Sequence, residues 1–106
     1  MKVDDILNGR KRRPTHPGAL LREDLLPALQ LTQEEFAQRL GVSRRTVNEI
    51  VNERRPISVD MAIRLGKLIG DGPGIWLRMQ LAVDVWDAWQ EHKDAYKRLK
   101  PIAKAA

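Results

Sequence analysis

Residues 32–52, TQEEFAQRLGVSRRTVNEIVN, contain two short helical patterns separated by a glycine. Thr32 can cap the first helix, and Glu35 follows where it completes a capping box. Gly41 is placed to end this helix, and Ser43 can cap the next one. The stretch therefore predicts two helices joined by a short turn.

The joint between these two helices is built from small and apolar residues. Ala37 is small where the first helix presses on the second, and Gly41 can adopt the positive φ that a tight turn between crossed helices requires. Val42, Val47 and Ile50 are spaced so that they are buried at the joint. This combination is typical of a helix-turn-helix unit.

The outer face of the second helix carries side chains that can read DNA. In a helix-turn-helix unit, the N-terminal part of this helix enters the major groove while the first helix lies across the backbone. Arg44 and Arg45 are then candidates for bidentate contacts to guanine, and Thr46 for a thymine methyl group or a phosphate. Asn48 is favoured over Glu49 for reading a base edge, because an unpaired carboxylate beside phosphates is unfavourable. Glu49 could instead pair with Arg45.

Phosphate contacts are expected around these base-reading residues. Gln33 and the backbone N–H groups at the start of the first helix suit a phosphate. Asn52, Arg54 and Arg55 suit phosphates at the end of the second helix and in the loop that follows. The alternative for the arginines is an ordinary solvated helix face or loop. The predicted DNA-binding residues are Gln33, Ser43, Arg44, Arg45, Thr46, Asn48, Asn52, Arg54 and Arg55.

Helical patterns continue on both sides of this motif. Before it, the apolar spacing from Gly18 predicts a short helix that Pro27 kinks or ends near Leu26. After it, Ser58 is placed to cap a further helix, which Gly70 stops.

A longer helix is expected over residues 75–99, beyond a turn rich in glycine and proline. Its apolar positions cover roughly three quarters of the circumference, which is more than one small domain can bury and therefore predicts a homodimer. Its tryptophans are expected in the core or the dimer interface rather than in a base-stacking platform. The predicted interface residues are Ile75, Met79, Trp86 and Trp89.

Length and composition set the domain organisation. The chain has 106 residues and a formal net charge of +5, and its apolar residues are mostly Leu, Ile, Val and Ala, so one compact all-α domain is expected. Residues 1–14 are predicted to form a flexible basic arm, residues 15–100 the DNA-binding domain, and residues 101–106 a frayed tail. The basic run 10–13 either reaches into a minor groove or only flanks a disordered tail, and the sequence leaves both open.

Several classes of function are disfavoured. The chain has no cysteine, and His16 and His92 lie too far apart in sequence to suggest a ligand pair, so neither a metal nor a cofactor is expected. No nucleophile–base pattern or glycine-rich phosphate loop indicates an enzyme. No apolar run approaches the roughly 20 residues of a membrane span and no signal-peptide pattern is present, so a cytoplasmic location is expected.

The motif and its flanks resemble a known family. Residues 33–50 are similar to the helix-turn-helix of phage-repressor-like (XRE-type) regulators. Over residues 15–86 the resemblance narrows to the HigA-type antitoxin family. The segments that carry it are His16-Pro17-Gly18, Ile57-Ser58-Val59-Asp60-Met61-Ala62-Ile63-Arg64-Leu65 and Trp76-Leu77-Arg78-Met79-Gln80.

This resemblance implies a five-helix, lambda-repressor-like domain that dimerises on a palindromic operator and, in paired operons, neutralises a HigB-like mRNA-cleaving toxin. Two departures stand out. Glu53 replaces the glycine that usually follows the Asn in the family, which could reshape the loop toward the phosphates. Gly74-Ile75 replaces the usual Glu-Phe, which affects packing detail.

The expected function is a DNA-binding repressor that is also an antitoxin and controls its own operon. Two alternatives are left open. One is a stand-alone XRE-type regulator with no toxin partner, which the absence of a neighbouring reading frame for a small basic nuclease would favour. The other is an RNA-binding or structural interaction protein, which only the charge supports, since the chain lacks an aromatic stacking motif or a GxxG clamp.

Overall fold

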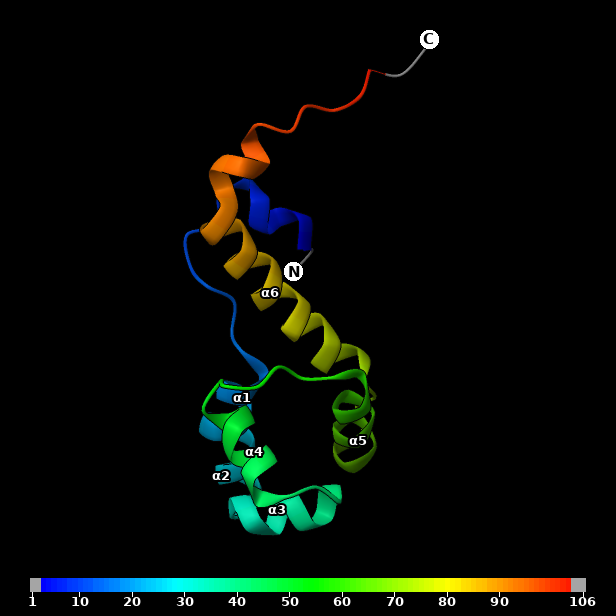
Figure 1. Ribbon diagram of the computed structural model, residues 1–106. Coiled ribbons are helices and arrows are strands. Elements are labelled where there is room, and N and C mark those ends of the chain that lie inside the picture. Colours follow the sequence, from blue (N-terminus) through cyan, green and yellow to red (C-terminus); the bar gives the residue numbers. More distant parts are fainter. Residues whose placement is uncertain (1–2, 104–106) are drawn as a thin grey trace.

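All regular secondary structure in the described range, residues 3–103 of this computed structural model, is helical (Figure 1). The elements are a 3-10 helix η1 (Val3–Asn8), α1 (Pro17–Leu20), a π-helical turn η2 (Leu21–Leu25), α2 (Leu26–Leu29), α3 (Gln33–Leu40), α4 (Arg44–Val51), α5 (Val59–Ile69) and α6 (Gly74–Lys97). Because α1, η2 and α2 follow without a break, they form one helix, and with α3, α4, α5 and α6 they make the five helices of the expected domain. The all-α prediction is confirmed.

The first helix differs from the prediction that Pro27 kinks or ends it near Leu26. It continues to Leu29, and Gln30 ends it in the left-handed conformation, with φ of 55°. The π-helical turn ends two residues before Pro27, and the Leu26 N–H that closes it donates to the Leu21 carbonyl, five residues back. Proline lacks an N–H and clashes with the carbonyl four residues earlier, so a wider turn at this point accommodates it.

The caps of α3 and α4 are those that the sequence predicts. Thr32 Oγ1 accepts the Glu35 N–H at 3.1 Å, and the Glu35 carboxylate accepts the Thr32 N–H at 3.1 Å. The bond that the Thr32 N–H donates to this carboxylate, followed by the interaction with the Thr32 side chain, holds the pKa of Glu35 below its usual value. Gly41 ends α3 with φ of 75°, and Ser43 Oγ accepts the Thr46 N–H at 3.1 Å to begin α4. The turn between the two helices is therefore set by local hydrogen bonds.

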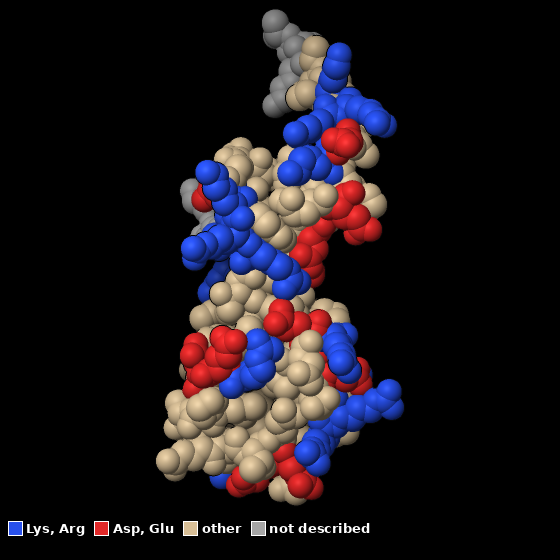
Figure 2. All heavy atoms as spheres, turned by 90° about the vertical axis from the view of Figure 1, so that its left-hand side faces the viewer, with Lys and Arg blue, Asp and Glu red and all other residues tan. Residues whose placement is uncertain are grey.

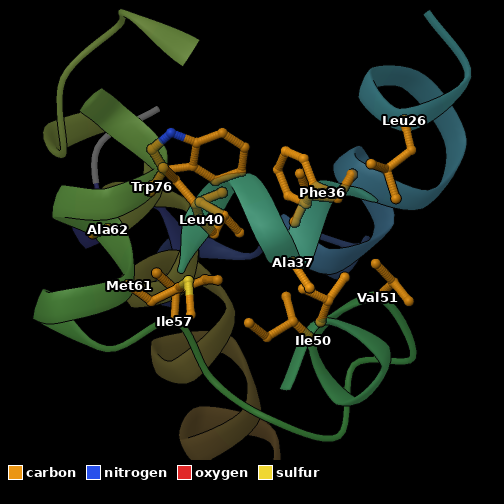
Figure 3. Close-up of a cluster of buried hydrophobic side chains, with 13 residues drawn as sticks. Leu26, Phe36, Ala37, Leu40, Ile50, Val51, Ile57, Met61, Ala62 and Trp76 are labelled. Carbon is orange, nitrogen blue, oxygen red and sulfur yellow. The ribbon is translucent and has the colours of Figure 1, made fainter. Parts of the chain in front are cut away.

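A single apolar cluster holds α3 and α4 against the rest of the domain. Figure 3 shows its side chains pointing toward one another between the helices. The indole of Trp76, at the start of α6, is fully buried and its N–H donates to Asp71 at 3.2 Å. The buried members are Leu21, Leu26, Phe36, Ala37, Leu40, Val47, Ile50, Val51, Ile57, Met61, Ala62, Leu65 and Trp76.

The long helix α6 extends well beyond this domain (Figure 1). The molecule measures 57 × 26 × 21 Å, and its radius of gyration of 16.9 Å exceeds the roughly 13 Å of a compact chain of this length. Non-helical torsions at His92, with φ of −121° and ψ of 22°, mark a kink in its distal part. The helix ends at Lys97, two residues before the predicted end at 99.

Both termini bear on the predicted domain limits. In the segment predicted to be a flexible arm, Ile6 is 1% exposed and packs with η1 against α6, and Pro14 is also buried. The segment is therefore apolar enough to dock on the otherwise bare part of α6. Residues 101–103 are exposed and without regular structure. Residues 1–2 and 104–106, which the arm and tail predictions include, lie outside the described range.

His16 gives the domain a predicted pH dependence. It is buried before α1, its Nδ1 accepts the Gly18 N–H at 2.9 Å, and burial lowers its pKa. A protonated Nδ1 cannot accept this bond, so below about pH 6.5 the unfolded chain binds more protons than the folded one. The free energy of unfolding should therefore fall between about pH 7.5 and pH 5.5, as measured by urea unfolding.

The matched variant for this experiment is His16→Asn, which keeps an acceptor at the cap but does not titrate. We expect its stability to change much less over the same pH interval. Equal pH dependence in the two proteins would assign the effect to other groups.

Candidate nucleic-acid interface

The first turn of α4 presents its two arginines to solvent. Arg44 and Arg45 are both exposed, and the side chain of Arg45 retains 89% of its accessible surface. On the opposite side of the helix, Val47 and Ile50 are buried in the core. The helix is thus anchored on one face and free to enter a groove with the other.

Glu49 is paired in the way that the sequence left open. Its carboxylate accepts Arg45 Nε at 3.0 Å and lies 3.4 Å from Arg55 Nε. The hydrogen bond from Arg45 lowers the pKa of Glu49, so this side chain carries its negative charge at neutral pH. Without DNA, Glu49 therefore neutralises two arginines, Arg45 and Arg55, that are predicted to contact DNA.

Polar side chains connect the outer surfaces of α3 and α4. Asn48 Nδ2 donates to Gln33 Oε1 at 3.1 Å, which joins a predicted base-reading residue to a predicted phosphate contact. Asn52 Nδ2 donates to the Asn48 carbonyl at 2.9 Å and closes the end of α4. This arrangement fixes the direction of the Asn48 amide and brings Gln33, Asn48 and Asn52 together.

Ser43 and Thr46 are also brought together, at the start of α4. Their hydroxyl oxygens lie 2.9 Å apart, and Ser43 Oγ already accepts the Thr46 N–H. Ser43 is exposed and Thr46 is half-buried. In this structure Ser43 therefore caps the helix that carries the arginines, in addition to its predicted role in DNA binding.

The loop after α4 holds Arg54 and Arg55, which are both exposed. It begins at Glu53, whose φ of 59° is left-handed, and this conformation explains why a glycine is common here in the family that the sequence resembles. The Glu53 carboxylate contacts Arg13 at 3.1 Å and Arg22 at 3.5 Å. The sequence did not predict these two partners, although a charged residue in place of a glycine is a signal that something must hold it.

Charged side chains are distributed unevenly over the face that Figure 2 shows. On the face in Figure 2, the upper half carries a band of Lys and Arg beside a separate row of Asp and Glu, while the two signs alternate in the lower half. No broad basic patch covers that face. On this face, attraction to DNA would depend on particular arginines more than on a broad basic patch.

The predicted dimer residues lie along α6, and three of them line two separate hollows. Ile75 and Met79 line a hollow together with Arg10 and Arg78. Trp89 lines a different groove, which is apolar, and its ring stacks on Tyr96 with centroids 5.8 Å apart. Trp86 and Trp89 are both half-buried. The apolar groove is lined by Leu7, Val85, Ala88, Trp89 and Tyr96.

Two classes of site have no counterpart in the described part of the chain. Between residues 3 and 103, no His, Asp and Glu side chains are grouped so that three or more could hold a metal ion. Over the same span, none of the helices combines the length and apolar character needed to cross a bilayer.

Comparisons with known proteins also identify a helix-turn-helix protein. The family model described as Helix-turn-helix matches residues 21–76, which is more than half of the chain. Antitoxin HigA-1 of Vibrio cholerae is 34% identical over 92 residues, covering 87% of this chain and 87% of that protein.

Solved structures agree with these matches. Pseudomonas aeruginosa antitoxin HigA, solved with the higBA promoter, gives a TM-score of 0.81 at 36% identity and covers 86% of this chain and 100% of that chain. An addiction module antidote protein of a HigA family from Coxiella burnetii gives a TM-score of 0.79 at 34% identity, with coverage of 86% and 100%. By its fold, its motif and these relatives, the chain belongs to the helix-turn-helix family, among the HigA-type antitoxins.

Proposed function

We propose that this protein is a sequence-specific DNA-binding repressor, that it is the antitoxin of a toxin–antitoxin pair, and that it binds the operator of its own operon. The observation that carries this proposal is the face of α4, where Arg44, Arg45 and Asn48 are exposed while Val47 and Ile50 anchor the helix. The P. aeruginosa relative solved with its promoter supports it. The function is binding rather than catalysis, and it belongs in the cytoplasm, where the operator lies.

Base reading is assigned to the exposed face of α4. Arg44 and Arg45 suit guanine, and Asn48 suits adenine, with its amide held by Gln33. Thr46 borders them and contacts a methyl group or a phosphate. Arg45 pairs with Glu49 through Nε, so a base contact that uses Nε would replace this ion pair.

Arg54 and Arg55 are assigned to phosphates, which leads to a prediction about salt. Changing either one to alanine should weaken binding to every sequence alike and reduce the slope of log affinity against log salt by about one unit. Fluorescence anisotropy with a labelled duplex at several salt concentrations measures this slope. Lys67→Ala, an exposed cation on α5, is the control and should leave the slope unchanged.

Selection of bound sequences from random duplex DNA, at one stated salt concentration, tests the function as a whole. We expect one motif to be enriched, in the form of an inverted repeat whose half-site centres lie about 34–36 Å apart. Failure to enrich any motif would contradict sequence-specific binding.

Homodimerisation is part of the proposal. The part of α6 beyond the core leaves an apolar groove uncovered between η1 and α6, and Leu81 on the same helix is 51% exposed. Burying such surface stabilises an association between two copies. Sedimentation at micromolar concentration should give the mass of two chains, and a monomer would contradict this part of the proposal.

The toxin partner is tested separately. A neighbouring gene for a small basic nuclease should stop cell growth when it is expressed alone. Co-expression with this protein should restore that growth and yield a complex of the two proteins. A chromosomal context without such a gene would leave the DNA-binding function intact and point to a stand-alone regulator.

A further inference from the structure

We propose that Arg13 is a positioning residue for DNA binding, which holds Glu53 and thereby the loop that carries Arg54 and Arg55. The inference rests on the proposed DNA-binding function and adds a residue that lies outside the helix-turn-helix motif. Arg13 acts in a set of four charged side chains, called here the Glu53 network. Its members are Arg13, Arg22, Glu53 and Asp87.

The need for such a network begins with the backbone of Glu53. Its φ of 59° lies in the left-handed region, where a Cβ atom is unfavourable and glycine is the preferred residue. Glu53 lies between the end of α4 and the two predicted phosphate contacts, so its torsion angles set the direction in which Arg54 and Arg55 leave the helix. A side chain that keeps Glu53 in this conformation therefore also keeps the loop in place.

Each oxygen of the Glu53 carboxylate has its own arginine. Arg13 Nη1 lies 3.1 Å from Oε1, and Arg22 Nη1 lies 3.5 Å from Oε2. Arg22 Nη1 also donates to the carbonyl of Val51, the last residue of α4. The end of α4 is thus fixed both through the backbone of Val51 and through the side chain of Glu53, two residues further on.

Arg13 connects this point to the long helix α6. Its Nε and Nη2 donate to the two oxygens of Asp87 at 2.9 and 2.8 Å, while Nη1 contacts Glu53. The hydrogen bonds from Arg13 lower the pKa of Asp87, so the pair is charged at neutral pH. A planar guanidinium can make the bidentate contact and the third contact together, which a lysine ammonium cannot do with the same geometry.

The network also removes a charge that would oppose DNA. An unpaired Glu53 carboxylate beside Arg54 and Arg55 would repel the phosphates that these two residues are proposed to bind. Arg13 and Arg22 neutralise this carboxylate through contacts within the protein. Arg13, which belongs to the basic run 10–13, is therefore engaged within the protein rather than placed as part of a minor-groove arm.

The test compares Arg13→Ala, Glu53→Gly and the double variant in binding to the duplex that the wild type selects from random DNA. Arg13→Ala should weaken binding about tenfold, because the loop no longer holds Arg54 and Arg55 toward the phosphates. Glu53→Gly should bind at least as well as wild type, since glycine adopts a positive φ and carries no charge. In the double variant, Glu53→Gly should restore the binding that Arg13→Ala loses, which a general loss of stability would not permit.

Two further variants keep the result interpretable. Asp87→Asn, which frees Arg13 from α6, should reproduce part of the defect, while Glu91→Ala, one turn further along α6, should leave binding unchanged. Thermal unfolding of each variant identifies a temperature at which all are folded. A salt slope reduced by about one without rescue by Glu53→Gly would make Arg13 a direct phosphate contact and overturn the proposal. Unchanged binding by Arg13→Ala would overturn it too, whereas a wild type that selects no motif would instead overturn the DNA-binding function on which it rests.

Discussion

Replacing Arg44 and Arg45 together with alanine is expected to abolish sequence-specific DNA binding and leave the fold intact. Each bidentate contact to guanine contributes roughly 1–3 kcal/mol to discrimination, so the loss of two should weaken binding to the selected duplex by roughly 30-fold to 10⁴-fold. Binding to random DNA should fall much less, because the phosphate contacts around α4 remain.

The fold should survive this change for reasons visible in α4. Both arginines lie in its exposed first turn, where alanine is a good helix former, and the Ser43 cap is untouched. The pair that Arg45 forms with Glu49 lies at the surface, where an ion pair contributes little to stability. Circular dichroism and urea unfolding of the double variant should therefore match wild type closely.

A second double variant separates specific contacts from charge. Lys67→Ala with Lys97→Ala also removes two positive charges, but from α5 and α6, where both side chains are exposed. It should retain the selected motif and most of the affinity. If it loses affinity as strongly as the arginine variant, net charge rather than base reading controls binding.

The parts of the structure that follow from the sequence depend on near neighbours along the chain. The capping box of Thr32 and Glu35, the left-handed Gly41 and the Ser43 cap are all contacts within a few residues, so residue types at fixed spacing identify them. The same spacing places the arginines on the outer face of α4. Fold class and the candidate interface could therefore be predicted from local chemistry.

The parts that the sequence does not predict depend on distant contacts. Arg13 meets Glu53 across 40 residues and Asp87 across 74, and no periodicity connects these positions. Ile6 is buried because α6 passes over it, although its own segment looks like a polar arm. The π-helical turn before Pro27 is a backbone adjustment within a helix that packing keeps continuous.

Helical periodicity also gave an incomplete account of α6. It measures how much of the circumference is apolar, but it does not show which part each neighbour covers. In the structure, Trp76 is buried in the domain core and η1 packs along the distal half. Ile75 and Met79 line one hollow on α6 and Trp89 lines another, and the groove containing Trp89 is apolar and open.

Gly18→Ala is expected to destabilise the domain more than any exposed change in the helix-turn-helix. Gly18 is buried where α1 crosses α4, and an added Cβ would lie 1.8 Å from the Ile50 carbonyl oxygen and 2.8 Å from its carbon. These are backbone atoms of α4, so no side-chain rotation can relieve the overlap and the two helices must separate. Overpacking commonly costs about 1–3 kcal/mol, and we expect more than about 3 kcal/mol here, from a total of roughly 5–15 kcal/mol.

Urea unfolding followed by tryptophan fluorescence measures this loss, and Gly74→Ala is the matched control. At Gly74, also in a helix, the added Cβ would approach only the end of the flexible Arg78 side chain, at 2.8 Å, so the change should be small. Equal effects of the two substitutions would show that the crossing of α1 and α4 is not tightly packed. Because α4 carries the proposed base-reading residues, the folded fraction of Gly18→Ala should also bind the selected duplex less tightly, although Gly18 itself is buried behind α4. A variant that is destabilised but binds normally would mean that α4 keeps its position without α1, supported by α3 alone.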